Sequence, residues 1–380
     1  MVRVFAIAKT PGWSHRFEQL ISQRDDIEIA RMQFGDDGLL GQLKTSHADI
    51  VAIEGGPDWN HVQQITRSIM EAHPLPVVIL VMEPVGGEEL QAMGSLDAGA
   101  LSLLNMPQFV ETTEEPVLAE QLSKSIRLMA EVKVVRRWDS ARLESLSRPH
   151  HGSHASVHIN HHLDIVAIGA SAGGTKALQE VFSKLTADFP LPILVVQHIA
   201  KGYLGGLSRW LEEQTALRIM IAEDGQTLEG GTVYLAPDDA HLTVDQKHRI
   251  LLIDDEPING FKPSIARLFR SIQETFGRQA VAILLSGMGN DGAQEMLQLH
   301  LAGAFTIAQD KETSLIHGIP GEAIKLDAVN SVLPVHEIGP ILLSIAARQA
   351  RLEDTGDRFI DRMNAAAQEQ YVNRNRNISR

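Results

Sequence analysis

Short apolar runs alternate with amphipathic stretches along this chain, in two separate series. In the first series, the runs with strand character are Val2–Ala8, Ile27–Met32, Asp49–Glu54, Pro76–Met82 and Ala100–Leu104. The stretches with helical spacing are Trp13–Ser22, Trp59–Glu71, Glu88–Leu96 and Val117–Val134. Five strands that alternate with helices predict a doubly wound parallel sheet, which makes the first series an α/β domain.

The second series begins after residue 162 and follows the same rule. Its predicted strands are Ile165–Gly169, Ile193–Gln197, Ala280–Leu285 and Ala304–Ala308. Its predicted helices are Gly173–Leu185, Tyr203–Gln214, Pro263–Phe276, Asp291–Leu301 and Val335–Arg348. A β-rich middle interrupts the alternation at Thr232–Leu235, His241–Val244 and Arg249–Ile253. We therefore expect a second doubly wound parallel-sheet domain that carries a β-hairpin insertion.

Two polar segments bound these series. Residues 136–162 contain Pro149 and the run HHGSHASVHINHH, so we interpret them as a His-rich linker between domains at 1–135 and 163–350. The linker histidines could bind a transition metal, but nothing in this polar segment predicts the fixed geometry that a metal site needs. We therefore expect no metal site. Residues 351–380 form a charged tail that we expect to begin as a helix and to fray.

Composition excludes several classes of function. The formal net charge is −14, so no basic excess exists to neutralise the phosphates of a nucleic acid. The sequence contains no cysteine, which removes disulfides and thiolate nucleophiles and fits a cytoplasmic protein. It has neither a secretory signal nor an apolar run of about 18 residues that could span a membrane. We expect a cytoplasmic protein that is not inserted in a membrane.

The densest chemical signal is DIVAIGASAGGTKAL, residues 164–178. A strand runs into a glycine-rich turn that carries Ser171, and a helix follows, so the helix N-terminal amides favour negative charge beside this hydroxyl. The pattern Gly-x-Ser171-x-Gly matches the nucleophile elbow of serine esterases. The same segment also reads as a degenerate phosphate-binding loop or as a tight turn without chemistry. The segment alone leaves all three interpretations open.

Two other strand ends supply the partners that a serine nucleophile needs. The strand ILVVQ is followed by His198, and the strand ending at Leu285 is followed by a glycine-rich turn that contains Asp291. Because the carboxyl ends of parallel strands share one sheet edge, Ser171, His198 and Asp291 are expected to lie together. Taken singly, His198 could be a core histidine and Asp291 a helix cap. Taken together, they favour a hydrolase.

Seven motifs follow one another between about residues 164 and 345: IGASAGGTKAL, VVQHIAKGYLGGL, AEDGQTLEGGTVYLAPDDAHL, FKPSIARLF, ILLSGMGNDGAQEM, TIAQDKETSLIHGIP and GEAIKL. In this order they resemble the CheB family of chemotaxis protein-glutamate methylesterases. The resemblance implies that Ser171 is the nucleophile, His198 the base and Asp291 the orienting carboxylate. It also implies that the backbone amide of Met288 stabilises the oxyanion. We expect no cofactor for this chemistry.

The implied reaction is the release of methanol from glutamate γ-methyl esters of methyl-accepting chemotaxis receptors, with deamidation of receptor glutamines as a second activity. Two positions depart from the family pattern. Ala172 stands where threonine is often found, and Gly318–Glu322 lacks the usual arginine, which could alter the choice of substrate. For Ser264, which follows Lys262 and Pro263, we expect only a structural role.

The first domain resembles a response-regulator receiver in length, strand order and the strand PLPVVIL, yet it lacks the receiver's phosphorylation residues. Ala8 and Lys9 stand where an acidic pair belongs, and Met106 stands where a lysine belongs. Glu54 occupies the phosphoacceptor position. Without carboxylates Mg²⁺ has few ligands, so we predict a pseudo-receiver that is not phosphorylated in the usual way. Glu54 could mimic a phosphoaspartate; we favour an inert relic in a domain that now serves as a docking surface.

Two other function classes stay open at this point. The degenerate first domain is compatible with an adaptor in a chemosensory complex that binds receptors, and other chemosensory proteins, without turnover. The glycine-rich loop is compatible with a dinucleotide-binding protein, but His198 stands where an acidic ribose-binding residue would be expected. The complete Ser, His and Asp set favours the enzyme.

Overall fold

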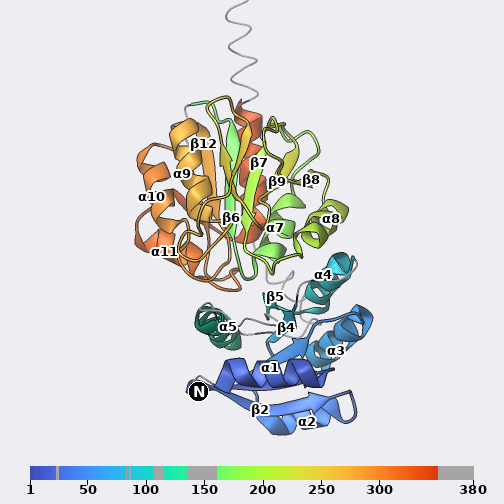
Figure 1. The fold of residues 1–380 in the computed structure, drawn as a ribbon. Helices are drawn as coiled ribbons and strands as arrows, with labels where there is room; N and C mark the ends of the chain where they lie inside the picture. The colour runs from blue at the N-terminus through green and yellow to red at the C-terminus, as the bar shows by residue number, and fades with distance from the viewer. Residues whose placement is uncertain are drawn as a thin grey trace, which may run out of the picture.

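The computed structural model describes residues 1–22, 25–82, 84, 87–106, 115–132, 134 and 161–349. The two series of strands and helices form two stacked bodies, each built on a parallel sheet (Figure 1). This confirms the predicted fold class. Most of the predicted linker, and the whole predicted tail, lie outside the described residues.

The first sheet has five parallel strands in the order β2-β1-β3-β4-β5. Its strands are β1 (Val2–Ala8), β2 (Ile27–Phe34), β3 (Ile50–Glu54), β4 (Val77–Val81) and β5 (Ser102–Asn105). Its helices are α1 (Pro11–Ser22), α2 (Leu39–Ser46), α3 (Trp59–Ala72), α4 (Glu89–Ala98) and α5 (Glu115–Ala130). This order is that of flavodoxin-like folds, which agrees with the expected receiver-like domain on a doubly wound parallel sheet. The central strands β3 and β4 are buried along their whole length.

Helix α2 was not predicted from the sequence. It spans only eight residues, follows Gly38 in a left-handed conformation, and has no side-chain N-cap. Gly41 within it further weakens the helical pattern. Burial of Leu39 and Leu43 against the core stabilises this helix, which is a tertiary effect that local propensity does not reveal.

The second sheet has seven strands in the order β14-β13-β12-β6-β7-β9-β8, all parallel. Its strands are β6 (Ile165–Ala170), β7 (Ile193–Gln197), β8 (Arg218–Ile221), β9 (Thr232–Leu235), β12 (Ala280–Leu284), β13 (Phe305–Gln309) and β14 (Ser331–Leu333). Its helices are α7 (Gly174–Phe182), α8 (Leu204–Gln214), α9 (Ile265–Thr275), α10 (Ala293–Leu301), α11 (Ile319–Lys325) and a helix over residues 335–349. Strands β12, β6 and β7 lie side by side at the centre and are completely buried.

The β-rich middle divides between two sheets. Strands β10 (His241–Val244) and β11 (Ile250–Ile253) form the antiparallel hairpin that was predicted. Strand β9 instead joins the main sheet, where it runs parallel to β7 and β8. Strands β8 and β14, like helix α11, were not predicted, because they are short segments at sheet edges or between longer elements.

The two bodies are held together where α4 packs on α8. The Asp97 carboxylate pairs with the Lys176 ammonium and also accepts a hydrogen bond from the Trp210 indole at 3.0 Å. Gly206 lies so close to Glu89 that an added Cβ would come within 2.3 Å of the backbone of this residue. This close approach fixes the two bodies relative to each other. Among the described helices, none is both long and apolar enough to cross a membrane.

Candidate active site

Ser171 lies directly after β6, at the corner where the chain turns into α7. The turn requires glycine at position 173, which has a φ of +79° and where a Cβ would lie 2.5 Å from Leu315. The Ser171 amide donates to the Ser286 carbonyl at 3.0 Å, and the Ser171 carbonyl accepts from the Gly174 amide at 2.8 Å. The backbone of the candidate nucleophile is therefore fixed from both sides, while its side chain lines a cavity.

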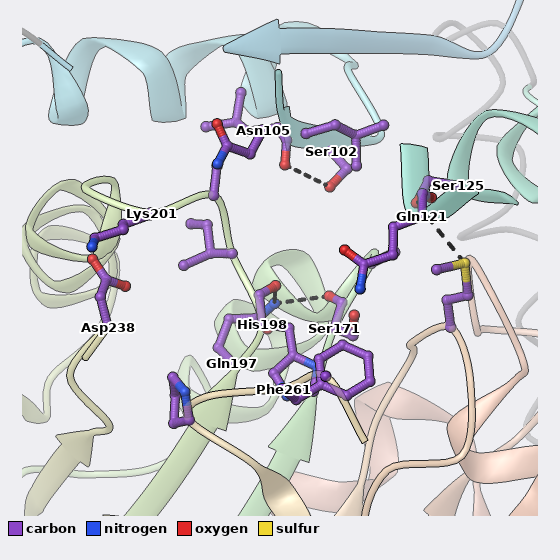
Figure 2. A pocket seen from close by; sticks show the side chains of 18 of the residues that line it. Ser102, Asn105, Gln121, Ser125, Ser171, Gln197, His198, Lys201, Asp238 and Phe261 are labelled. Atoms are coloured by element: carbon purple, nitrogen blue, oxygen red, sulfur yellow. Dashed lines mark hydrogen bonds between the residues drawn. The ribbon is translucent and has the colours of Figure 1, made fainter. Parts of the chain in front are cut away.

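His198 follows the neighbouring strand β7, and its amide donates to the Ala170 carbonyl at 2.9 Å. Its ring stacks on Phe261, with 4.3 Å between the ring centroids and 2° between the planes. The side chain is only 12% exposed. The stacking and the strand-end position hold the imidazole beside Ser171, as Figure 2 shows.

Asp291 follows the third central strand, β12, and its side chain is buried at the N-terminus of α9. It accepts hydrogen bonds from the Ser264 hydroxyl at 2.9 Å and from the amides of Ile265 and Ala266 at 2.7 and 3.1 Å. Burial acts to raise the pKa of Asp291, but the adjacent His198 ring and the two amides outweigh burial and lower this pKa below its ordinary value. Asp291 therefore stays ionised.

The structure brings His198 and Asp291 into contact, with 3.2 Å between Nε2 and Oδ2. The contact is not aligned as a hydrogen bond, and neither ring nitrogen has a hydrogen-bond partner in the described part of the chain. Ser171 and His198 line the same cavity without a hydrogen bond between their side chains. Such bonds are often long or poorly aligned before substrate binds, and they tighten in the complex.

Met288 lies in the glycine-flanked turn between β12 and Asp291 and also lines the cavity. Its backbone N–H has no acceptor among the described residues. Gly289, with a φ of +91°, allows the tight turn that follows. A free amide beside the nucleophile has the chemistry of an oxyanion donor.

The cavity has a volume of about 310 Å³ and lies between the two bodies. Ser171 and His198 lie on one side of it, and side chains of β5 and α5 lie opposite (Figure 2). Across the gap, the Ser125 hydroxyl is 4.0 Å from the Met288 sulfur. The first domain therefore forms one wall of the cavity. The residues of this domain that line the cavity are Ser102, Leu103, Leu104, Asn105, Gln121, Ser125 and Met129.

Three buried polar side chains support the site, and sequence reasoning singled out only one of them. Ser264 was expected to be structural, and it holds Asp291 as described above. The Ser286 hydroxyl donates to the Ala172 carbonyl at 2.8 Å and accepts from the Ile316 amide at 3.0 Å. Gln197 bonds the backbones of both Ser171 and His198. For Gln197, the only signal in the sequence was its position as the polar last residue of the otherwise apolar strand β7.

A second acid, Asp238, lines the cavity farther from the serine. Burial raises its pKa, although its hydrogen bond from the Gly202 amide at 2.9 Å opposes this. It holds the loop that follows His198. Of the positions that depart from the family pattern, Ala172 lines the cavity, whereas Glu322 lies in α11 and pairs with Lys325 at 2.6 Å.

Glu54 ends β3 and is buried, but its carboxylate is fully engaged. It accepts hydrogen bonds from the Lys9 amide, from the Thr10 amide at 2.8 Å and from the Thr10 hydroxyl at 2.7 Å. Burial lowers the pKa of Lys9, whose ammonium donates to the Asp58 carbonyl at 3.2 Å. Glu54 thus links β3 to the β1–α1 turn, which is a structural task.

The described residues contain no group of three or more His, Asp or Glu side chains that could hold a metal ion. Most histidines of the predicted linker cluster (His150, His151, His154 and His158) lie outside the described residues. Of the other two, His162 contacts Asp164, with 3.1 Å between Nε2 and Oδ1.

Comparisons with known proteins identify relatives that cover most of this chain. The family model "CheB methylesterase" matches residues 166–342. A protein-glutamate methylesterase/protein-glutamine glutaminase of Nitrosospira multiformis is 36% identical over 92% of this chain and 98% of its own length. One from Hahella chejuensis is 42% identical over 73% of this chain and 80% of its own length. The Thermotoga maritima CheB methylesterase catalytic domain is 33% identical over 48% of this chain and 98% of its own, with a TM-score of 0.47.

Proposed function

The chain belongs to the CheB methylesterase family, and from this premise we propose that Ser171, His198 and Asp291 form its catalytic triad. The protein is a protein-glutamate methylesterase and protein-glutamine glutaminase. Its substrates are glutamate γ-methyl esters, and glutamines, of methyl-accepting chemotaxis receptors. The observation that carries the residue assignment is the convergence of three neighbouring parallel strands, which bring these three side chains to one buried sheet edge.

The mechanism assigns one step to each group. His198 takes the proton of the Ser171 hydroxyl as Ser171 attacks the ester carbonyl, and Asp291 stabilises the imidazolium that forms. The Met288 amide donates to the developing oxyanion. The tetrahedral intermediate collapses to an acyl-serine, and methanol leaves with the proton from His198. Water, deprotonated by His198, then releases glutamate. With a glutamine substrate, ammonia leaves in place of methanol.

Covalent trapping tests the nucleophile. A fluorophosphonate reagent should label the wild-type protein on one serine, which peptide mass spectrometry should identify as Ser171. The Ser171→Ala variant should not be labelled. Ser102→Ala is a matched control, because Ser102 lines the same cavity from the opposite side and bonds only the neighbouring Leu103 carbonyl. Labelling of Ser171→Ala at the wild-type rate would refute the assignment.

We also propose that residues 1–135 form a regulatory domain that restricts access to the catalytic domain, residues 163–350, without aspartyl phosphorylation. Support comes from the cavity walls that β5 and α5 supply and from the occupied hydrogen bonds of Glu54. Glu54 has no free carboxylate oxygen to offer, and Lys9 stands beside it. This arrangement favours neither a phosphate acceptor nor an exposed phosphate mimic.

Two further proposals concern the setting. The cysteine-free sequence supports a cytoplasmic protein. Other chemosensory proteins could dock on the first domain, since it has kept a receiver-like sheet order while losing the receiver's phosphorylation residues. Pull-down of the full chain by chemoreceptor arrays, with and without the other array proteins, tests the second proposal.

A further inference from the structure

Gln197 is the last residue of β7, directly before His198, and its side chain is only 6% exposed. Its amide nitrogen Nε2 donates to two carbonyl oxygens, that of Ser171 at 2.8 Å and that of His198 at 2.8 Å. Both donor hydrogens are therefore used, and each holds the backbone of one candidate catalytic residue. Gln197 lines the same cavity as these two residues, and Figure 2 shows it next to His198.

The chain makes room for this side chain. A Cβ at position 174 would lie 2.3 Å from Gln197 Oε1, so only glycine leaves space for Gln197 at the start of α7. Oε1 itself is buried and has no hydrogen-bond partner in the described part of the chain. A buried acceptor without a partner costs free energy. The side chain is thus kept for its two donor bonds, since its acceptor oxygen stabilises nothing in the described structure.

We propose that Gln197 is a positioning residue that sets the distance between the Ser171 hydroxyl and the His198 imidazole. The two residues belong to different strands, β6 and β7, and each lies past the end of its strand. Beyond the last backbone bond between these segments, from the His198 amide to the Ala170 carbonyl, Gln197 is the side chain that joins them. It acts through the backbone and does not touch the reacting atoms. The proposal rests on the proposed function, in which Ser171 and His198 exchange a proton.

The amide group is neutral, which suits this task. It holds two carbonyls without adding a charge near the imidazolium that forms during the reaction. A glutamate at this position has the same shape but presents oxygen where Nε2 donates, so it would repel both carbonyls. A methionine has similar length and volume and removes both donors. It also removes the unpartnered acceptor, so the fold should tolerate it well.

The test compares Gln197→Met and Gln197→Glu with the wild-type full chain, using p-nitrophenyl acetate hydrolysis and fluorophosphonate labelling. A misplacement of about 1 Å between reacting groups can cost about 100-fold in rate. We expect kcat and the labelling rate of Gln197→Met to fall about 10- to 100-fold. KM should stay within about twofold, since methionine keeps a similar length and volume at this part of the cavity lining. The melting temperature should move by less than about 4 °C. Gln197→Glu should lose at least as much kcat.

Two results would overturn the proposal. One is a kcat of Gln197→Met within twofold of the wild-type value. The other is a loss of kcat that is matched by a comparable loss of thermal stability, which would make Gln197 merely structural. Ser171→Ala, measured in parallel, separates this failure from failure of the triad. If Ser171→Ala is inactive and Gln197→Met is normal, only the positioning role fails; if Ser171→Ala is active, both proposals fall.

Discussion

The two domains each bury a carboxylate at the end of a central strand, and they use it differently. Asp291 and Glu54 both accept hydrogen bonds from two successive backbone amides and one hydroxyl. Asp291 also contacts His198, a titratable group whose ring nitrogens have no other partner in the described structure. Glu54 has no such neighbour among the described residues: its hydrogen bonds come from the Lys9 amide and from Thr10, and the Lys9 ammonium donates to the Asp58 carbonyl.

The comparison indicates how a carboxylate proposed to be catalytic, Asp291, differs from a structural one, Glu54. Both are held rigidly, so rigidity alone does not identify chemistry. What distinguishes Asp291 is coupling to a side chain with unfilled hydrogen-bonding capacity that faces a cavity. In the first domain, the equivalent capacity is consumed by the β1–α1 turn. This contrast supports the proposal that the sheet edge with Asp291 carries out the reaction, whereas the edge with Glu54 belongs to the scaffold.

The largest expected effect separates the two carboxylates by activity. Asp291→Asn should lower kcat for methanol release by about 10⁴-fold, because the imidazole loses its orienting partner. Glu54→Gln should leave kcat within about twofold, because a group that only caps a turn contributes no transition-state stabilisation. Equal losses in the two variants would break the comparison.

The second prediction concerns the contribution of Glu54 to the stability of the first domain. Glu54→Gln replaces one acceptor oxygen by a donor and should destabilise the first domain by about 1–3 kcal/mol, the cost of leaving buried amides unsatisfied. Urea unfolding followed by tryptophan fluorescence, to which the buried Trp13 and Trp59 of the first domain contribute, provides the measurement. Unchanged stability would mean that Glu54 is the inert relic the sequence suggested.

A substitution at the interface between the two domains should have a smaller effect on the rate of methanol release. Asp97→Ala removes the partner of both Lys176 and Trp210 and should weaken the packing of α4 on α8. If the first domain restricts access, methanol release should rise several-fold. Loss of one or two hydrogen bonds between the domains shifts the equilibrium by about that factor towards a state in which the cavity is open. A lower rate would indicate that the first domain assists catalysis.

The smallest expected effect concerns acid stability. The pKa of Asp291 is lower in the folded chain than the value of about 3.9 in an unfolded chain, so its contribution to stability is complete above about pH 4. That contribution is lost as pH falls through the folded-state pKa. The melting temperature of Asp291→Asn should therefore fall less steeply than that of the wild type as the pH drops below about 4. Parallel curves would contradict the lowered pKa.

The central buried strands could be predicted from the sequence more reliably than the short peripheral helices and strands. The fully buried strands β6, β7 and β12 are continuous apolar runs bounded by glycine-rich turns, so both their positions and the residues at their ends could be read directly. Helix α2 and strand β8 escaped detection because short elements at the periphery depend on tertiary contacts that local pattern does not encode.

For the site, the sequence predicted the residue types at strand ends but not their supports. Ser171, His198 and Asp291 lie where the parallel topology requires. The hydrogen bonds of Gln197 and Ser264 cross between segments that are far apart in the chain, and a single sequence carries no record of such contacts. The role of Glu54 was hidden for the same reason, since its partners lie 44 and 45 residues earlier in the chain.

One measurement tests the central claim that the second domain alone performs the chemistry and that the first has no phosphorylation switch. Methanol release from a methylated chemoreceptor is followed for the full-length wild type and for Ser171→Ala, each with and without acetyl phosphate and Mg²⁺. We predict the same wild-type rate in both conditions and no enzymatic release by Ser171→Ala. A wild-type rate that rises with acetyl phosphate, or release by Ser171→Ala at the wild-type rate, would contradict the account.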